Sequence, residues 1–224
     1  MSLDASWRAW GTRTENAGVA KGSKTRQFGA QLQTQAGILV GFLGVMWLLE
    51  LVDTFLLGGA LDFYGIRPRS VSALPNILAA PFLHGGLEHL AANTIPLAVL
   101  GWLVLVRAIR TFVIVTIVVI VLGGLGVWLF AAPNSIHIGA SGLIFGYLGY
   151  LLLRGYFERS FLSILIALVV ALVYGGALLG VLPGQQGISW EGHLFGFLGG
   201  ALAAWMLAPR RVNPGFWPAS SGSR

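Results

Sequence analysis

Long apolar runs separated by short polar segments dominate the chain from residue 36 to residue 208. The runs cover residues 36–57, 86–106, 111–131, 141–153, 161–182 and 193–208. A helix that crosses a hydrocarbon core needs about 20 mostly apolar residues, and most of these runs approach or exceed that length. Pro133, Pro183 and Pro209 follow three of the runs, where a proline ends a helix. The pattern predicts an all-α, polytopic membrane protein with six transmembrane helices.

Polar segments flank the apolar region on both sides. Residues 1–35 carry five basic side chains and no apolar run, and this composition is compatible with disorder. Residues 209–224 are rich in proline, serine and glycine. We therefore expect a basic N-terminal tail over residues 1–35, a membrane domain over residues 36–208 and a polar C-terminal tail over residues 209–224.

Composition and charge support this interpretation. Of the 224 residues, 56% are hydrophobic and only 10% are charged, which excludes an ordinary water-soluble domain. The absence of cysteine excludes disulfides and thiol catalysis. If the N-terminus is cytoplasmic, only Arg67 and Arg69 of the 14 basic residues fall in outer loops. That distribution obeys the positive-inside rule for a cell-membrane protein with both termini cytoplasmic. The net charge of +6 is thus a topology signal and requires no nucleic-acid partner.

Three clusters of polar residues stand at the starts of the second, fourth and sixth runs. They contain His89 and Asn93, then Ser141, then His193. Lipid-facing helices need only apolar side chains, so polar side chains at membrane depth require a reason. In the predicted topology all three runs enter the membrane from the outer side. We therefore expect the clusters to meet in a site that opens toward the outer face.

Ser141 begins a run of only about 13 residues, which corresponds to about 20 Å of helix. In a hydrocarbon core about 30 Å thick, this serine would lie roughly 10 Å below the outer boundary. Non-helical backbone such as residues 131–140 is tolerated at that depth only beside protein or a water-filled cavity. The sequence therefore predicts a water-accessible pocket that is recessed into the bilayer.

Ser141 and His193 are a candidate nucleophile and base. A serine hydroxyl is a weak nucleophile until a base takes its proton, and histidine is the usual base near neutral pH. Small residues let helix backbones approach closely, and both runs carry a glycine ridge. These glycines are Gly142, Gly146 and Gly149 on one run, and Gly196 and Gly200 on the other. Phe145 lies one turn after Ser141, where its ring can stack on the imidazole.

Donors for a developing oxyanion are available from two places. His89 and Asn93 are four residues apart, so they share one helical face and both can donate hydrogen bonds. The helix start at Ser141 also leaves backbone N–H groups without partners inside the helix.

These residues also have ordinary structural interpretations. A serine at a helix start is often a cap, and an intramembrane asparagine often joins helices. His137, four residues before Ser141, is a rival base that lies in a loop. Glu50 and Asp53, near the outer end of the first run, are interpreted as solvated or paired between helices.

A metal site and a transporter are further alternatives. His84, Glu88 and His89 invite a zinc interpretation, but the two histidines are five residues apart instead of four, so we expect no metal. A transporter predicts inverted repeats and charged residues at mid-membrane, and the second to sixth runs do not favour either.

Taken together, the spans and the three clusters resemble the rhomboid family of intramembrane serine proteases. The matching motifs are His84-x4-His89-x3-Asn93, Gly139-x-Ser141-Gly142 and His193-x2-Gly196-x3-Gly200. The resemblance covers residues 36–208 and is greatest to the compact six-span bacterial members. The chain departs from the family in having Phe145 where tyrosine is frequent, and in lacking a Trp-Arg motif in the first outer loop.

The resemblance implies a serine–histidine dyad of Ser141 and His193 without a catalytic aspartate. It implies an oxyanion hole formed by His89, Asn93 and the backbone N–H of Ser141. Supporting positions would be Gly139, Gly142, Phe145, Gly196 and Gly200. The implied reaction is hydrolysis of peptide bonds in or next to transmembrane segments of membrane proteins, without a cofactor. The alternative is a catalytically silent rhomboid-like protein that binds transmembrane helices; such relatives typically lack the serine or the histidine. The oligomeric state stays open.

Overall fold

The computed structural model describes residues 5–184 and 187–209, with side-chain surroundings from residue 26 onward. Within these ranges the regular structure is helical, and one isolated β-bridge pairs Ile66 with His137. The predicted all-α membrane fold is confirmed. The six long helices are α1 (Ala5–Val52), α3 (Leu87–Leu105), α4 (Ile109–Phe130), α5 (Ser141–Glu158), α6 (Phe161–Tyr174) and α7 (Trp190–Met206).

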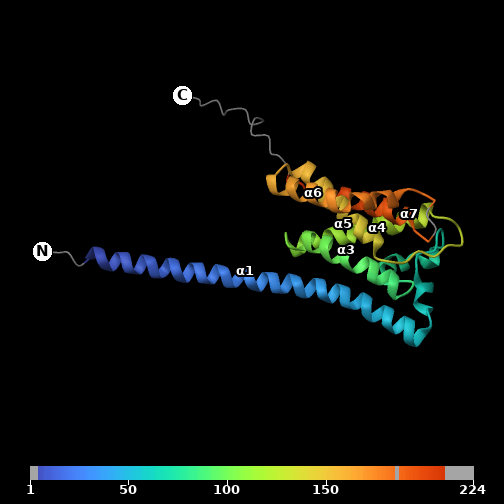
Figure 1. Ribbon diagram of the computed structural model, residues 1–224, viewed down its shortest axis with the longest axis horizontal. Helices are drawn as coiled ribbons and strands as arrows, with labels where there is room; N and C mark the ends of the chain where they lie inside the picture. Colours follow the sequence, from blue (N-terminus) through green and yellow to red (C-terminus); the bar gives the residue numbers. More distant parts are fainter. Residues whose placement is uncertain (1–4, 185–186, 210–224) are drawn as a thin grey trace, which may run out of the picture.

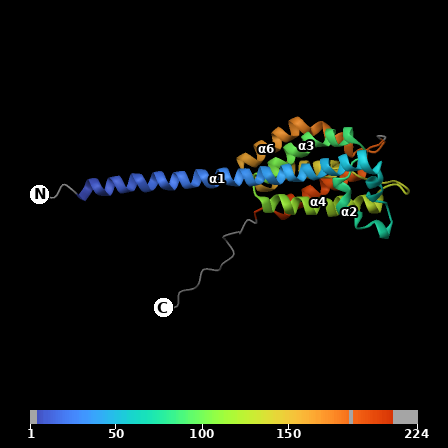
Figure 2. The ribbon, with the colours of Figure 1, turned by 90° about the horizontal axis from the view of Figure 1, so that it is seen from below.

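Short helical pieces connect the long ones. Between α1 and α3 the chain forms η1 (Asp53–Leu57), η2 (Ala60–Tyr64), η3 (Val71–Ala73), α2 (Asn76–Ala79) and η4 (Ala80–Phe82), and η5 (Gly175–Val181) continues α6. The long helices run side by side, and the connecting segment before α3 gathers at one end of the bundle (Figures 1 and 2). Polar caps fix two helix starts: Ser160 accepts the Ser163 N–H, and Ser189 accepts the Gly192 N–H.

Helix α1 does not stop at the boundary that the sequence predicts at residue 35. It runs without a break from Ala5 to Val52 and extends beyond the bundle at one end (Figure 1). The composition of residues 1–35 is compatible with disorder, and the structure describes this segment as helical from Ala5 onward. No proline occurs before Pro68, and extending an existing helix adds one hydrogen bond for each residue fixed, so the apolar part of α1 propagates the helix outward. The C-terminal tail beyond residue 209 lies outside the described residues.

Four helical segments are long and apolar enough to cross a membrane. They are Arg26–Leu57, Leu87–Leu105, Ile109–Phe130 and Phe161–Val181. Helices α5 and α7, with 18 and 17 residues, do not meet that criterion. Helix α5 lies inside the bundle, and its residues 143–151 are all buried, whereas α7 exposes Leu198, Trp205 and Met206. A helix surrounded by other helices is selected for packing more than for contact with lipid. The count of six spans therefore stays a prediction.

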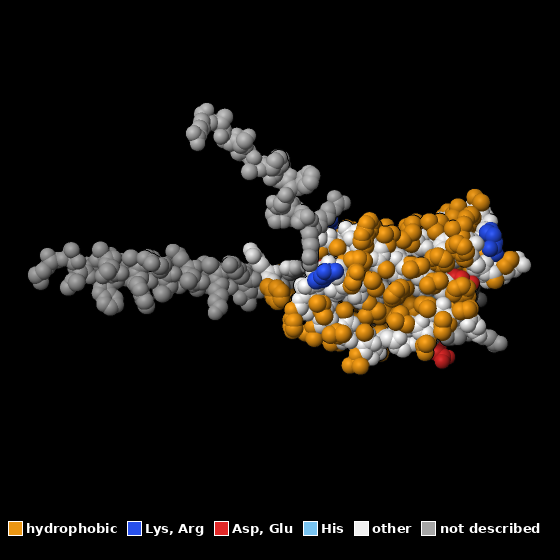
Figure 3. Space-filling view, turned by 90° about the horizontal axis from the view of Figure 1, so that it is seen from above, with side chains coloured by type: hydrophobic (Ala, Val, Ile, Leu, Met, Phe, Trp, Pro, Cys, Tyr) orange, Lys and Arg blue, Asp and Glu red, His pale blue; other side chains and the backbone are white. Residues whose placement is uncertain are grey.

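The outside of the bundle is apolar. Figure 3 shows hydrophobic side chains over the visible face of the helices, with a few charged side chains toward the ends. Helix α6 buries only Ser163 and Val170 among its 14 residues. An exposed apolar surface of this extent would aggregate in water, whereas lipid covers it without cost. The described chain is accordingly a membrane protein.

Glycines bring α5 and α7 into backbone contact at the centre of the bundle. A Cβ atom placed on Gly196 would overlap the carbonyl of Gly142, and one on Gly200 would overlap the carbonyl of Gly146. Gly149 likewise meets the carbonyl of Phe197. The two glycine ridges identified in the sequence thus lie against each other, and they set how closely the starts of α5 and α7 approach.

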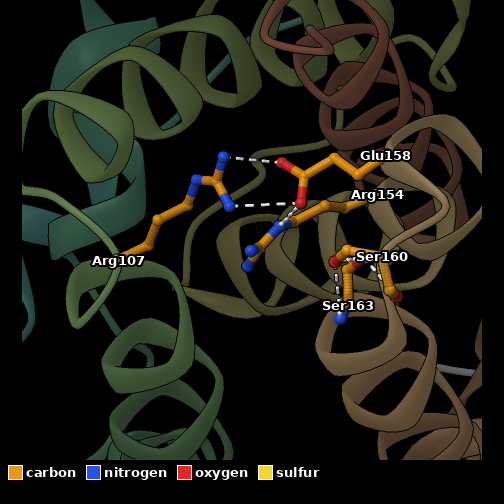
Figure 4. A network of polar contacts seen from close by, with 5 residues as sticks. All are labelled: Arg107, Arg154, Glu158, Ser160 and Ser163. Carbon is orange, nitrogen blue, oxygen red and sulfur yellow. Dashed lines mark hydrogen bonds and ion pairs between the residues drawn. The ribbon is translucent and has the colours of Figure 1, made fainter.

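An ion-pair cluster fastens the end of the bundle at which α3 and α5 finish (Figure 4). The Glu158 carboxylate lies 2.8 Å from Arg107 Nη2 and 2.8 Å from Arg154 Nε. Arg154 is buried near the end of α5, and the pairing compensates its charge. The cluster joins the α3–α4 connection to α5 at the end opposite to Ser141.

Candidate active site

The starts of α3, α5 and α7 surround one cavity of about 650 Å³. His89 and Asn93 from α3, Ser141 from α5 and His193 from α7 all line it. The three polar clusters of the sequence therefore meet at one end of the bundle, although His89 and His193 are 104 residues apart. Ser141 and His193 share the cavity wall, but no hydrogen bond joins them in the described part of the chain. Such contacts are often long without a substrate and shorten when it binds.

Ser141 occupies the first position of α5, directly after the N-cap residue Ala140. The N–H groups of the first turn of a helix have no partners within the helix, and their positive end favours a negative charge. The Ala140 N–H is already used, since it donates to His84 Nε2 at 3.2 Å. The N–H groups from Ser141 onward are those that could face an oxyanion.

Gly139 shapes the backbone before Ser141. Its φ of 112° is a conformation that residues with a side chain rarely adopt. A Cβ atom here would lie 2.8 Å from His89 Cε1 and 3.9 Å from Asn93 Nδ2. Any side chain at this position would therefore displace His89. The absence of one lets both α3 residues come within contact of the backbone that carries Ser141.

Asn93 is a buried donor that lacks an acceptor. The residue is buried, and its Nδ2 atom has no hydrogen-bond partner in the described part of the chain. An unsatisfied buried amide costs free energy, so it requires an explanation. An amide that lies next to Gly139 and lines the cavity beside Ser141 is placed to donate to an oxygen of a bound molecule.

The surroundings of His193 fix its tautomer. Its Nδ1 lies 2.9 Å from the carbonyl oxygen of Gly180, and a carbonyl only accepts, so Nδ1 carries the proton. The neutral ring therefore keeps its lone pair on Nε2, the nitrogen that a general base uses. The ring of Phe145 stacks on the imidazole with centroids 4.0 Å apart and planes 9° apart. This is the stacking geometry expected from the sequence.

Gly180 and His84 are site residues to which the sequence interpretation gave no role. Gly180 lies in η5, far from any motif, and only the fold brings its carbonyl to His193. His84 supports the loop before Ser141 through the Ala140 N–H. Burial, with a smaller effect of His89, lowers the pKa of His84 to about 4, so His84 is neutral at pH 7 and able to accept. The position of His84 in the first motif was the signal that could have suggested this.

His137, the rival base, also lines the cavity, but its ring nitrogens already have other partners. Both ring nitrogens are engaged, Nε2 with Ser135 Oγ and Nδ1 with Ser189 Oγ, each at 2.7 Å. Glu50 and Asp53 are buried rather than solvated, which corrects one of the two interpretations given above. Glu50 accepts from the Thr54 hydroxyl, and Asp53 accepts the Leu61 N–H, because the chain leaves its α-helix here and frees donors that need partners.

Metal-ligating residues do not gather in the described part of the chain. No group of three histidine, cysteine, aspartate or glutamate side chains lies close enough to hold a metal ion there. His84 and His89 meet edge to face, with ring centroids 5.2 Å apart.

Comparison with known proteins gives consistent matches. The model of the Rhomboid domain matches residues 72–210, a range that contains all four cavity residues from the motifs. An uncharacterized protein of Mycobacterium tuberculosis is 47% identical over 182 residues, which cover 77% of this chain and 75% of that protein. An uncharacterized protein of Mycobacterium leprae is 43% identical over 182 residues, covering 77% and 72%. RHOMBOID-like protein 4 of Arabidopsis thaliana is 32% identical over 141 residues, covering 60% of this chain and 34% of that protein.

Proposed function

The chain belongs to the rhomboid family, and on that premise we propose that it is an intramembrane serine endopeptidase. It would hydrolyse peptide bonds in or next to transmembrane segments of other membrane proteins. The observation that carries the proposal is the orientation of His193. Its Nδ1–H is bound to the Gly180 carbonyl, its Nε2 is left to take a proton, and Ser141 lines the same cavity.

The proposed reaction begins when His193 Nε2 takes the proton of the Ser141 hydroxyl. Ser141 Oγ attacks the carbonyl carbon of the scissile bond, and the carbonyl oxygen becomes an oxyanion. Asn93 Nδ2, His89 and the N–H groups at the start of α5 stabilise this charge. His193 then returns its proton to the leaving amine, which leaves an acyl-enzyme. A water molecule, activated by the same imidazole, hydrolyses the acyl-enzyme and regenerates Ser141.

The substrate must present an accessible carbonyl. A peptide in a transmembrane helix hides its carbonyls in hydrogen bonds, so the substrate segment has to unwind before attack. Residues that weaken a helix, such as glycine and proline, would favour cleavage nearby. We further propose that both termini are cytoplasmic and that the cavity opens toward the outer face, because that orientation obeys the positive-inside rule.

The alternative function is a silent protein that binds transmembrane helices without cleaving them. Such a protein has no need for a defined tautomer of His193 or for a buried amide donor without an acceptor. The presence of both features in one cavity with Ser141 favours the enzyme.

Cleavage of a reporter transmembrane segment in reconstituted vesicles tests the proposal. The wild type should produce two fragments, while Ser141→Ala and His193→Ala should bind the reporter without cutting it. Ser72→Ala is the matched control, because Ser72 is an exposed serine in η3 outside the cavity and should leave cleavage unchanged. Binding without cleavage by the wild type would support the silent alternative, and cleavage by Ser141→Ala would refute the assigned nucleophile.

A further inference from the structure

His137 joins three separate segments beside the candidate site. Its backbone pairs with Ile66, through N–H to O distances of 2.9 and 3.0 Å in the two directions. Its imidazole bridges Ser135, in the α4–α5 connection, and Ser189, the N-cap residue of α7. Hydrogen bonds of the backbone and of both ring nitrogens therefore fix the position of His137. The same bonds fix the residues that it contacts.

The direction of each hydrogen bond can be assigned. The Ser135 hydroxyl donates to the Ala132 carbonyl at 2.6 Å, so Ser135 Oγ accepts from His137 Nε2–H. The imidazole then has a lone pair on Nδ1, which accepts the Ser189 hydroxyl proton. Ser189 Oγ in turn accepts the Gly192 N–H at 3.2 Å. In this series of hydrogen bonds, every donor has an acceptor only while His137 is neutral.

The chain of bonds ends at the element that carries the candidate base. Ser189 caps α7 through its side chain, and its carbonyl accepts the His193 N–H at 3.1 Å. The position of Ser189 therefore sets where α7 begins and how its first turn is wound. His193 belongs to that first turn.

We propose that neutral His137 is a positioning residue that latches the start of α7 and thereby holds His193 in line with Ser141, and that protonation of His137 weakens this latch by reversing its bond to Ser189. The inference rests on the proposed function, since it concerns the alignment of the same two side chains. It assigns to His137 a task that requires no contact with substrate.

Protonation would reverse the hydrogen bond to Ser189. A charged imidazole donates from Nδ1, so the Ser189 hydroxyl must turn to accept that proton, and its own proton then loses its acceptor. Burial lowers the pKa of His137 and nearby Glu191 partly offsets this, so the neutral form prevails at pH 7. His89 and His193 line the same cavity, and Arg67 lies with Ser135 on the neighbouring surface. The latch should therefore weaken only as pH falls below about 6.5.

Two substitutions separate the two bonds of the imidazole. In His137→Asn the amide oxygen can replace Nδ1 and accept from Ser189, and the side chain does not titrate. In His137→Gln the longer amide reaches the position of Nε2, so it can bond Ser135 but leaves Ser189 without an acceptor. Both variants remove the imidazole, and each keeps the bond that the other loses, so the slower variant shows which of the two bonds is needed.

The test is the pH profile of reporter cleavage from pH 8 to pH 4, in wild type and both variants. The acid limb of log(kcat/KM) should be steeper than one in the wild type, because a second histidine must be neutral for full activity, and should have a slope of one in His137→Asn. His137→Gln should be about tenfold or more slower at pH 7.5, because a small misplacement of a catalytic group is costly. Equal slopes in wild type and His137→Asn, or wild-type activity in His137→Gln, would overturn the inference.

Hydrogen–deuterium exchange separates this inference from the proposed function. At pH 7.5, amides at the start of α7 should exchange faster in His137→Gln than in wild type or His137→Asn. If no protein cleaves the reporter but this difference is present, the latch stands and the protease proposal fails. If exchange is the same in all three proteins, the latch is wrong whatever the activity.

Discussion

Gly180 and Phe145 hold the His193 imidazole from two sides. The carbonyl of Gly180 anchors Nδ1, and the ring of Phe145 supports the face of the imidazole. The arrangement leaves little room, since a Cβ atom on Gly180 would lie 3.0 Å from Phe145 Cζ and 3.1 Å from His193 Nδ1. A methyl group there would push the imidazole away from its anchor.

We therefore expect Gly180→Ala to lower kcat by about tenfold or more, because a displacement of a few tenths of an ångström misaligns the base. Gly176→Ala is the matched control: the residue belongs to the same helical piece, and its Cβ would meet nothing within 4 Å. Cleavage rates of the two variants, measured side by side, check this. Equal rates would show that the Gly180 contact does not orient His193.

Replacing Asn93, whose amide is unpaired, should lower activity without lowering stability. Asn93→Ala should lower kcat by about 10²–10³-fold if Nδ2 donates to the oxyanion. The unfolding temperature should stay the same or rise, because the variant removes a buried donor without an acceptor. Kinetics and thermal unfolding of the same detergent preparation test both. A drop in stability with unchanged kcat would make Asn93 a packing residue.

Single residues were predictable from the sequence where a local spacing revealed them. The four-residue spacing of His89 and Asn93, and the motif around Ser141, are visible without a fold. Gly180 and His137 act through contacts with residues far away in the chain, and no spacing encodes such contacts. His84 is intermediate, since its place in the motif was visible but its bond to the Ala140 backbone was not.

Among the helices, the contact between α5 and α7 is the one that brings Ser141 and His193 together. A Cβ atom on Gly200 would overlap the Gly146 carbonyl and lie 2.8 Å from the Tyr150 backbone nitrogen. Neither neighbour is a flexible side chain, so the two helices would have to separate.

Gly200→Ala should therefore destabilise the fold by about 3 kcal/mol or more, and activity should fall with it. Gly44→Ala provides the comparison, because Gly44 is also within a helix but its Cβ would meet nothing within 4 Å. There the substitution should be neutral or stabilising by up to about 1 kcal/mol. Unfolding by a denaturing detergent compares the two variants, and similar stabilities would show that the helices do not depend on this contact.

The helix boundaries agree with the ends of the apolar runs where contact with lipid or with the core determines those boundaries. The run at 86–106 corresponds to Leu87–Leu105, and the run at 111–131 corresponds to Ile109–Phe130. The fourth run ended too early at residue 153, because Arg154 looks like the end of a membrane segment until its buried pairing with Glu158 is known. The short pieces between residues 71 and 82 escaped prediction, since single 3₁₀ or α-helical turns are too short to show a hydrophobic period.

The whole molecule separates its polar chemistry into two ends. The cavity and the loops around it lie at the end where α3, α5 and α7 begin, and the cluster of Arg107, Arg154 and Glu158 lies at the end where α3 and α5 finish (Figures 1 and 4). Between them the surface is apolar (Figure 3). The distribution of charges along the sequence predicts this division. No pattern in the sequence predicts that α1 extends beyond the bundle.

If His193 activates Ser141, a reagent that reacts with activated serines should label this one residue. Detergent-solubilised protein is treated with a fluorophosphonate, and tandem mass spectrometry locates the adduct. We expect an adduct on Ser141 whose formation slows by about a hundredfold or more when His193 is replaced by alanine. An adduct on a different serine, or equal labelling of wild type and His193→Ala, would contradict it.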